Sequence, residues 1–116
     1  MVNSKALLMG IGVFIIAHII TWFQLNGQFF SAWFKNNNFI LSLCGIPISL
    51  LYIYGTKCCY EGFGGLVWPG RFIGFACGMV IFSLLTSYIM NEGVTIKTGI
   101  SLGLALALVS VQIFWK

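Results

Sequence analysis

Charged residues are scarce in this sequence of 116 residues. Asp, Glu, Lys and Arg together make up 7% of it, whereas a soluble domain carries about 25%. So few charges cannot cover a water-facing surface, and 59% of the residues are hydrophobic. A membrane-spanning helix needs about 20 apolar residues. The length therefore accommodates four such helices joined by short connections.

Acidic side chains are nearly absent, which removes most catalytic arrangements. Glu61 and Glu92 are the two acids, and both fall in predicted connectors. The single histidine, His18, has no acid near it in the sequence, so no nucleophile–base set is visible. Glycine is abundant, but no glycine-rich loop leads from a strand to a helix. We therefore predict that the protein is not an enzyme and needs no cofactor.

Clusters of cations and paired cysteines are also missing. The six cations are spread along the chain, and without a basic patch we expect no nucleic-acid partner. The four cysteines lack the C-x2-C spacing that is typical of structural zinc sites. We predict no metal site, and we interpret the adjacent Cys58 and Cys59 as free thiols.

The hydropathy pattern predicts an all-α membrane protein, a four-transmembrane-helix bundle in one domain covering residues 1–116. The predicted spans are residues 5–24, 39–54, 67–90 and 95–115. Pro47 is expected to kink the second span. Residues 55–65 carry two charges and several glycines, and we predict a polar hairpin there.

The stretch after the first span is too aromatic for a simple loop. Phe29, Phe30, Trp33 and Phe34 recur at helical spacing between polar residues. This pattern is typical of a short helix lying in the headgroup region. We predict such an interfacial helix at about residues 27–36.

The cations also bear on orientation. In this topology one side of the membrane receives Lys5, Lys57, Arg71 and Lys116, and the other side receives Lys35 and Lys97. The positive-inside rule then favours both termini on the same, cytoplasmic side of the cell (inner) membrane. The excess is small enough to be compatible with insertion in both orientations.

Small residues recur every four positions in the last two spans. The third span has Gly70, Gly74 and Gly78, and the fourth has Gly99, Gly103 and Ala107. Such spacing places small residues on one helix face, where another backbone can approach closely. For the third span, packing within one chain and between chains fit equally well. For the fourth span we favour a contact between subunits of a homodimer.

Two ionisable residues lie within predicted spans, where such groups are functional candidates. His18 could accept a proton near neutral pH, or it could be a neutral ring hydrogen-bonded between helices. Arg71 could reach the headgroups, or it could point into the bundle to bind an anion or pair with Glu61.

The residues from Leu66 to Gly70 (LVWPG) resemble the aliphatic-aliphatic-Trp-x-Gly motif of the small multidrug resistance family, within the drug/metabolite transporter superfamily. The turn Asn91–Thr95 (NEGVT) is similar to the turn before that superfamily's last helix. The resemblance implies a dimer, often antiparallel, in which Trp68 lines the substrate pocket and nearby glycines let the helix bend. His18 occupies roughly the place of the family's coupling glutamate, and Gly65 that of its pocket tyrosine.

Two hypotheses about function follow. The first is a small membrane transporter acting as a homodimer, with Trp68, His18 and Arg71 as substrate-binding residues. Its small-molecule or lipid substrate would be anionic, neutral or lipid-linked, because the spans hold a cation and no carboxylate. The second is a non-transporting accessory or assembly protein that packs against a larger partner. A transporter would gather its polar residues around a cavity, whereas an accessory protein could bury them in contacts.

Overall fold

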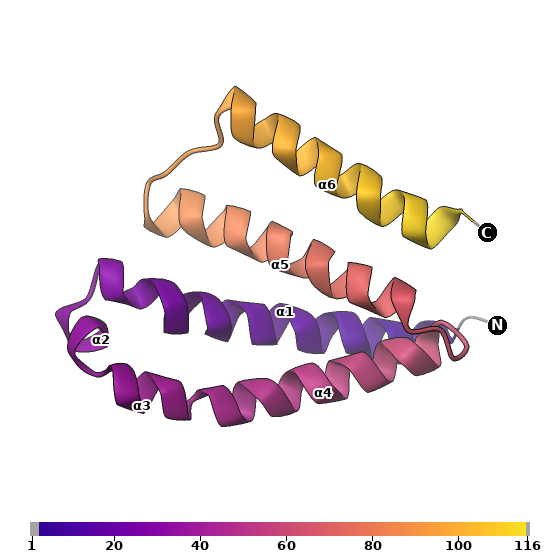
Figure 1. Cartoon of the computed structure of the whole chain (residues 1–116), viewed down its shortest axis with the longest axis horizontal. Coiled ribbons are helices and arrows are strands. Elements are labelled where there is room, and N and C mark those ends of the chain that lie inside the picture. The colour runs from indigo at the N-terminus through magenta and orange to yellow at the C-terminus, as the bar shows by residue number, and fades with distance from the viewer. Residues whose placement is uncertain (1–2, 116) are drawn as a thin grey trace.

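The computed structural model describes residues 3–115. The helices, labelled in Figure 1, are α1 Ser4–Asn26, the 3-10 turn η1 Gly27–Phe29, α2 Ala32–Asn36, α3 Asn38–Leu43, α4 Gly45–Gly62, α5 Trp68–Ile89 and α6 Ile96–Phe114. Four segments are long and apolar enough to cross a membrane: Ser4–Phe29, Asn38–Gly62, Trp68–Ile89 and Ile96–Phe114. The prediction of an all-helical protein with four such segments is confirmed.

The second span is interrupted near its start and ends later than the predicted residue 54. It is interrupted at Cys44, three residues before Pro47, and it then continues to Gly62. Proline has no N–H to bond the carbonyl four residues earlier, and this accounts for a break at that point. Residues 55–62 are helical and not a hairpin, so that prediction was wrong. Their glycines and cysteines are buried while Lys57 and Glu61 are exposed, and this one-sided burial is what supports a helix there.

The aromatic segment after α1 consists of η1 and the five-residue α2 in place of one helix. Phe29, Phe30 and Trp33 are all exposed. Phe30 also stacks on Trp22, with 6.0 Å between ring centroids. Trp22 itself is only 3% exposed, and its indole N–H donates to the Thr86 hydroxyl at 3.0 Å. Trp22 therefore joins α1 to α5.

The four long helices form an open layer and not a closed bundle. They lie side by side in the order α4, α1, α5, α6, and α6 packs mainly against α5 (Figure 1). The molecule measures 48 × 36 × 17 Å, so its thickness is less than half of either other dimension. Its accessible surface is 8002 Å² for 12.8 kDa, against about 6,300 Å² for a compact soluble protein of that mass. The excess surface is available to lipid or to other helices.

Glycines allow α1 and α4 to pack closely. A Cβ added at Gly10 would lie 2.8 Å from the Cys59 Sγ, and one at Gly62 would lie 2.9 Å from the Leu7 backbone. At Gly55 it would lie 2.9 Å from the Phe14 ring. Because lipid and side chains are equally apolar, helix association in a membrane depends on such close packing.

The glycine stripe of α5 faces this helix pair. Gly70 approaches Cys59 of α4, Gly74 approaches Phe14 of α1, and Gly78 approaches the ring of His18. The structure thus places the stripe in contacts within one chain.

The connection between α4 and α5 also depends on glycine. Gly64 and Gly65 have φ values of 68° and 92°, and the Gly65 N–H donates to the Tyr60 carbonyl at 2.8 Å. Positive φ angles are unstrained only for glycine. The turn returns the chain to the end of the layer where α1 begins and α6 ends (Figure 1). Lys116, counted above in the charge balance, lies outside the described residues.

We expect Gly55→Leu to lower the free energy of unfolding by about 1–3 kcal/mol, because the new side chain would overpack the Phe14 ring. Unfolding in detergent micelles, followed by circular dichroism, would measure it. Gly12→Leu is the matched control, since nothing lies within 4 Å of a Cβ at Gly12. Equal stability of the two variants would contradict the close packing of α1 and α4.

Candidate functional site

The polar centre of the molecule is His18, where α1, α4 and α5 meet. Its Nε2 lies 3.0 Å from the carbonyl oxygen of Gly74 on α5. The ring can come so near because Gly78 lacks a side chain; a Cβ at Gly78 would lie 3.0 Å from the His18 ring. The same glycines that pack α5 therefore also make room for the histidine.

Tyr52 of α4 is the second member of this centre, and it was not among the predicted site residues. Its hydroxyl lies 3.0 Å from the Nδ1 of His18 and 3.2 Å from the hydroxyl of Thr21. The two rings meet edge to face, with 5.3 Å between centroids. The predicted end of the second span at residue 54 would make Tyr52 an interface aromatic. Because the helix continues to Gly62, Tyr52 is not near its end. A hydroxyl inside an apolar span needs a hydrogen-bond partner, and this need was the feature of the sequence that could have indicated Tyr52.

The hydrogen-bond directions follow from chemistry. A carbonyl oxygen only accepts, so the Nε2–H of His18 donates to Gly74. In a neutral ring the Nδ1 then accepts, and the Tyr52 hydroxyl donates to it. The Tyr52 oxygen in turn accepts from the Thr21 hydroxyl. Every polar group of this three-helix network is thus satisfied with His18 uncharged, as expected for a neutral ring bonded between helices.

A cleft of about 560 Å³ opens beside this network, between α1, α4 and α5. Its volume is within the range of ligand pockets, about 300–1,000 Å³. It is lined by Phe14, His18, Tyr52, Thr56, Val67, Gly70, Arg71, Gly74, Phe75, Gly78, Met79 and Phe82. The lining is mainly apolar and contains a single cation and no carboxylate.

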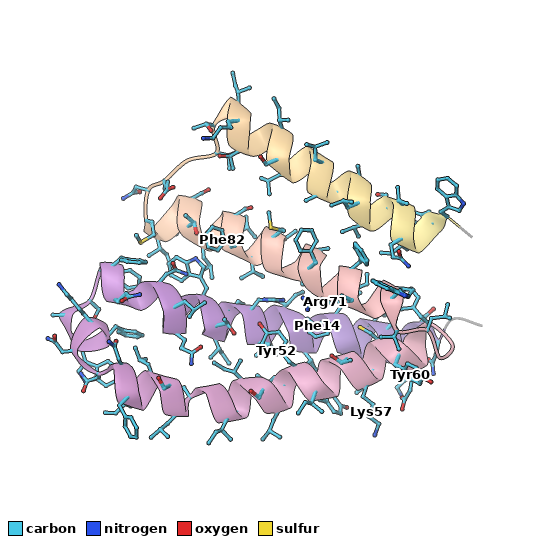
Figure 2. All side chains as sticks on the ribbon, in the orientation of Figure 1. Phe14, Tyr52, Lys57, Tyr60, Arg71 and Phe82 are labelled. Atoms are coloured by element: carbon cyan, nitrogen blue, oxygen red, sulfur yellow. The ribbon has the colours of Figure 1, made fainter. Side chains whose placement is uncertain are left out.

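Arg71 stands in the first turns of α5 and lines the cleft. In Figure 2 it lies beside Phe14, between α5 and α1, while Lys57 points away from these helices. Glu61 is exposed and is not part of the cleft lining. Arg71 is itself exposed, and it is the one charged residue among those that line the cleft.

The structure brings His18 and Arg71 to one cleft but leaves Trp68 outside it. Trp68 is 69% exposed, and its ring lies near that of Phe72, 6.4 Å between centroids. It could line a pocket only with a further chain. The resemblance implied such a pocket, and that implication stays a prediction.

The small-residue stripe of α6, Gly99, Gly103 and Ala107, does not pack against the other described helices. Ala105 and Val109 are buried and line a second pocket together with α5 residues. Gly99, Gly103 and Ala107 are exposed, and nothing lies within 4 Å of a Cβ added at Gly103. This face of α6 is free for another helix.

The cysteines do not form a metal centre in the part of the chain that the structure describes, which holds no group of three or more His, Cys, Asp or Glu side chains placed to bind an ion. All four are free thiols. Cys58 and Cys59 are buried where α4 packs on Gly10 of α1, so their role in this structure is packing.

Comparison with protein families, curated proteins and solved structures finds no match for this chain. What its geometry defines is a class: an α-helical protein with four helices long and apolar enough to span a membrane, and a lateral cleft beside a hydrogen-bonded histidine.

Because His18 is the single histidine, its ring can be observed without assignment. We expect ¹⁵N NMR of histidine-labelled, tag-free protein in lipid bilayers to show the Nε2–H tautomer with a hydrogen-bonded Nδ1. Tyr52→Phe should remove the Nδ1 hydrogen bond and cost about 0.6–1.7 kcal/mol of stability, as such bonds do in membranes. Tyr54→Phe, on the exposed face of α4, is the control. An Nδ1–H tautomer in the unaltered protein would contradict the network.

Proposed function

We propose that this protein is a small transporter of the drug/metabolite type that acts as a homodimer in the cell (inner) membrane. The observation that carries the proposal is the cleft of about 560 Å³ that collects His18, Tyr52, Thr56 and Arg71 from three helices. Polar groups are costly at membrane depth and are most often kept there for a function. An accessory protein would need them only as contacts, without a cavity beside them.

The cleft favours an anionic or neutral substrate over a cation. Arg71 is its one charged lining residue, and a guanidinium binds carboxylates and phosphates in a bidentate way. A cationic cargo would meet like charge with no carboxylate to offset it. A lipid-linked substrate suits the same cleft, which opens sideways: Phe75 and Phe82 in its lining are 41% and 50% exposed.

The proposed roles follow from these positions. Arg71 would bind the substrate's anionic group, and His18 would supply a titratable group whose hydrogen bonds join the three helices. The glycine stripe of α5, made of Gly70, Gly74 and Gly78, would let this helix move against α1 and α4. At glycine no side chains interlock, so none would have to separate when the helix moves. Movement of α5 would change the cleft and the hydrogen bond from His18 to Gly74 together.

Two features support a homodimer. One chain forms an open layer only 17 Å thick, which cannot enclose a substrate by itself. The exposed face of α6 with Gly99, Gly103 and Ala107 offers a surface on which a second α6 could pack closely. α1 begins and α6 ends at the same end of the layer (Figure 1), which supports the proposal that both termini lie on the same side of the membrane.

The same α6 face favours the second candidate function, a non-transporting accessory protein. A larger membrane partner could pack against that stripe as well as a second copy could. In this case the cleft would be filled by a side chain or helix of the partner, and no solute would cross.

Flux into liposomes containing the purified protein tests the transporter. We expect uptake of anionic or neutral members of a solute panel and little uptake of cationic ones. Gly74→Leu should fill the cleft and reduce uptake by about tenfold, a loss of roughly 1.4 kcal/mol. Gly12→Leu should leave uptake unchanged. Absence of flux for every solute, from folded and assembled protein, would favour the accessory function.

The oligomeric state tests the α6 contact separately. Gly103→Leu should convert dimers to monomers in mild detergent, measured by analytical ultracentrifugation, because the side chain would separate two closely packed backbones. Gly12→Leu again serves as the control. A dimer that persists in the Gly103→Leu variant would place the interface on another helix.

A further inference from the structure

The cleft changes character along its length. Arg71 and Thr56 lie toward the end where α4 and α5 are joined, His18 and Tyr52 lie farther along, and Met79 and Phe82 come last. Figure 2 shows Arg71 and Phe82 toward opposite ends of α5. A charged group at one end followed by apolar surface is the pattern that an amphiphile would match.

The cleft is also long and narrow. Its α5 lining runs from Gly70 to Phe82, and a rise of 1.5 Å per residue makes this about 18 Å. One leaflet of the hydrocarbon core is roughly 15 Å deep, half of about 30 Å, so a whole acyl chain could lie along it. A volume of about 560 Å³ spread along such a length makes the cleft narrow.

The polar network in the middle does not oppose such a chain. His18, Tyr52 and Thr21 bond to one another and to the Gly74 carbonyl. An aliphatic chain passing beside them would leave no donor or acceptor newly without a partner, so the usual desolvation penalty for buried polar groups would not apply. A small hydrophilic solute would find few further hydrogen bonds there.

The position of Arg71 sets the direction of the ligand. Gly70, its neighbour, packs against Cys59, which in turn packs against Gly10. Gly10 is six residues into α1, or about 9 Å from its start. The Arg71 guanidinium can reach the membrane surface from this depth. A head group bound there would have its chain pointing toward the bilayer centre, as a lipid of that leaflet does.

We propose that the cleft binds an anionic amphiphile with one aliphatic chain, with its carboxylate or phosphate on Arg71 and its chain along α5 past His18 to Phe82. The ligand would enter sideways from the leaflet in which Arg71 lies. This inference names a substrate class for the transporter proposed above and rests on that function for its physiological meaning.

The test is displacement of a fluorescent fatty acid, dansyl-undecanoate, from the protein in nanodiscs of zwitterionic phosphatidylcholine, with empty nanodiscs subtracted. We expect laurate and dodecyl phosphate to displace it. Hexanoate should do so weakly, and inorganic phosphate and dodecyltrimethylammonium should not. Phosphate alone as an equally good competitor would mean an anion site without a chain site, and would overturn the proposal.

Variants separate the head-group contact from nonspecific partitioning. Arg71→Gln should weaken laurate binding by about tenfold or more, as expected for a hydrogen bond to a charged group, and Arg71→Lys should restore part of it. Lys57→Gln is the matched control, because it removes a cation that is exposed and outside the cleft. Equal binding by the Arg71→Gln and Lys57→Gln proteins, or displacement by the cationic amphiphile, would overturn the proposal.

Binding and transport can fail independently. If laurate does not bind but the liposomes transport another solute, this inference falls and the transporter stands. If laurate binds in an Arg71-dependent way and no solute crosses, the site stands and the transporter falls.

Discussion

Close contact between helices at glycine is the constraint on which the rest of the structure depends. Gly10, Gly55 and Gly62 join α1 to α4, and Gly70, Gly74 and Gly78 hold α5 against this pair. In water a bundle would be held by burial of apolar surface, but in lipid that driving force is absent and dispersion between closely packed backbones replaces it. The network around His18 exists because these contacts bring its ring within 3.0 Å of the Gly74 carbonyl.

The cleft is the complementary result of the same packing. Where α5 meets α1 and α4 through glycine, the backbones are near, and where it carries Arg71, Phe75 and Phe82 the side chains stand around a groove. One helix therefore supplies both the close glycine contacts and much of the cleft lining. This combination distinguishes α5 from α6, whose exposed small residues have no counterpart within the chain.

Much of the fold could be predicted from composition and hydropathy, because a membrane helix requires a long apolar run and little else. The length of α4 could not be predicted so well. Gly55, Lys57, Glu61 and Gly62 have the composition of a loop, and only the contacts of both glycines with α1 show why a helix forms there. Local sequence does not contain that information.

The site was predictable in part from the sequence. His18 and Arg71 could be selected by the cost of charge in a membrane, and the cleft includes both. Tyr52 could not be selected, because aromatic residues are abundant and its partner is 34 positions away. Nothing in the sequence indicated that Trp68 would lie outside the cleft, since that depends on how α5 is rotated against α1.

The thinness of the layer has a consequence for the physics of the histidine. Among the described residues, Cys59 is the largest side chain that is fully buried, so this chain has a seam between helices and no true interior. His18 and Tyr52 are only partly buried, and the cleft opens beside them. The polarity around His18 therefore depends on the lipid beside it as well as on the protein. Lipid composition affects this site as the composition of a hydrophobic core affects a buried site in a soluble protein.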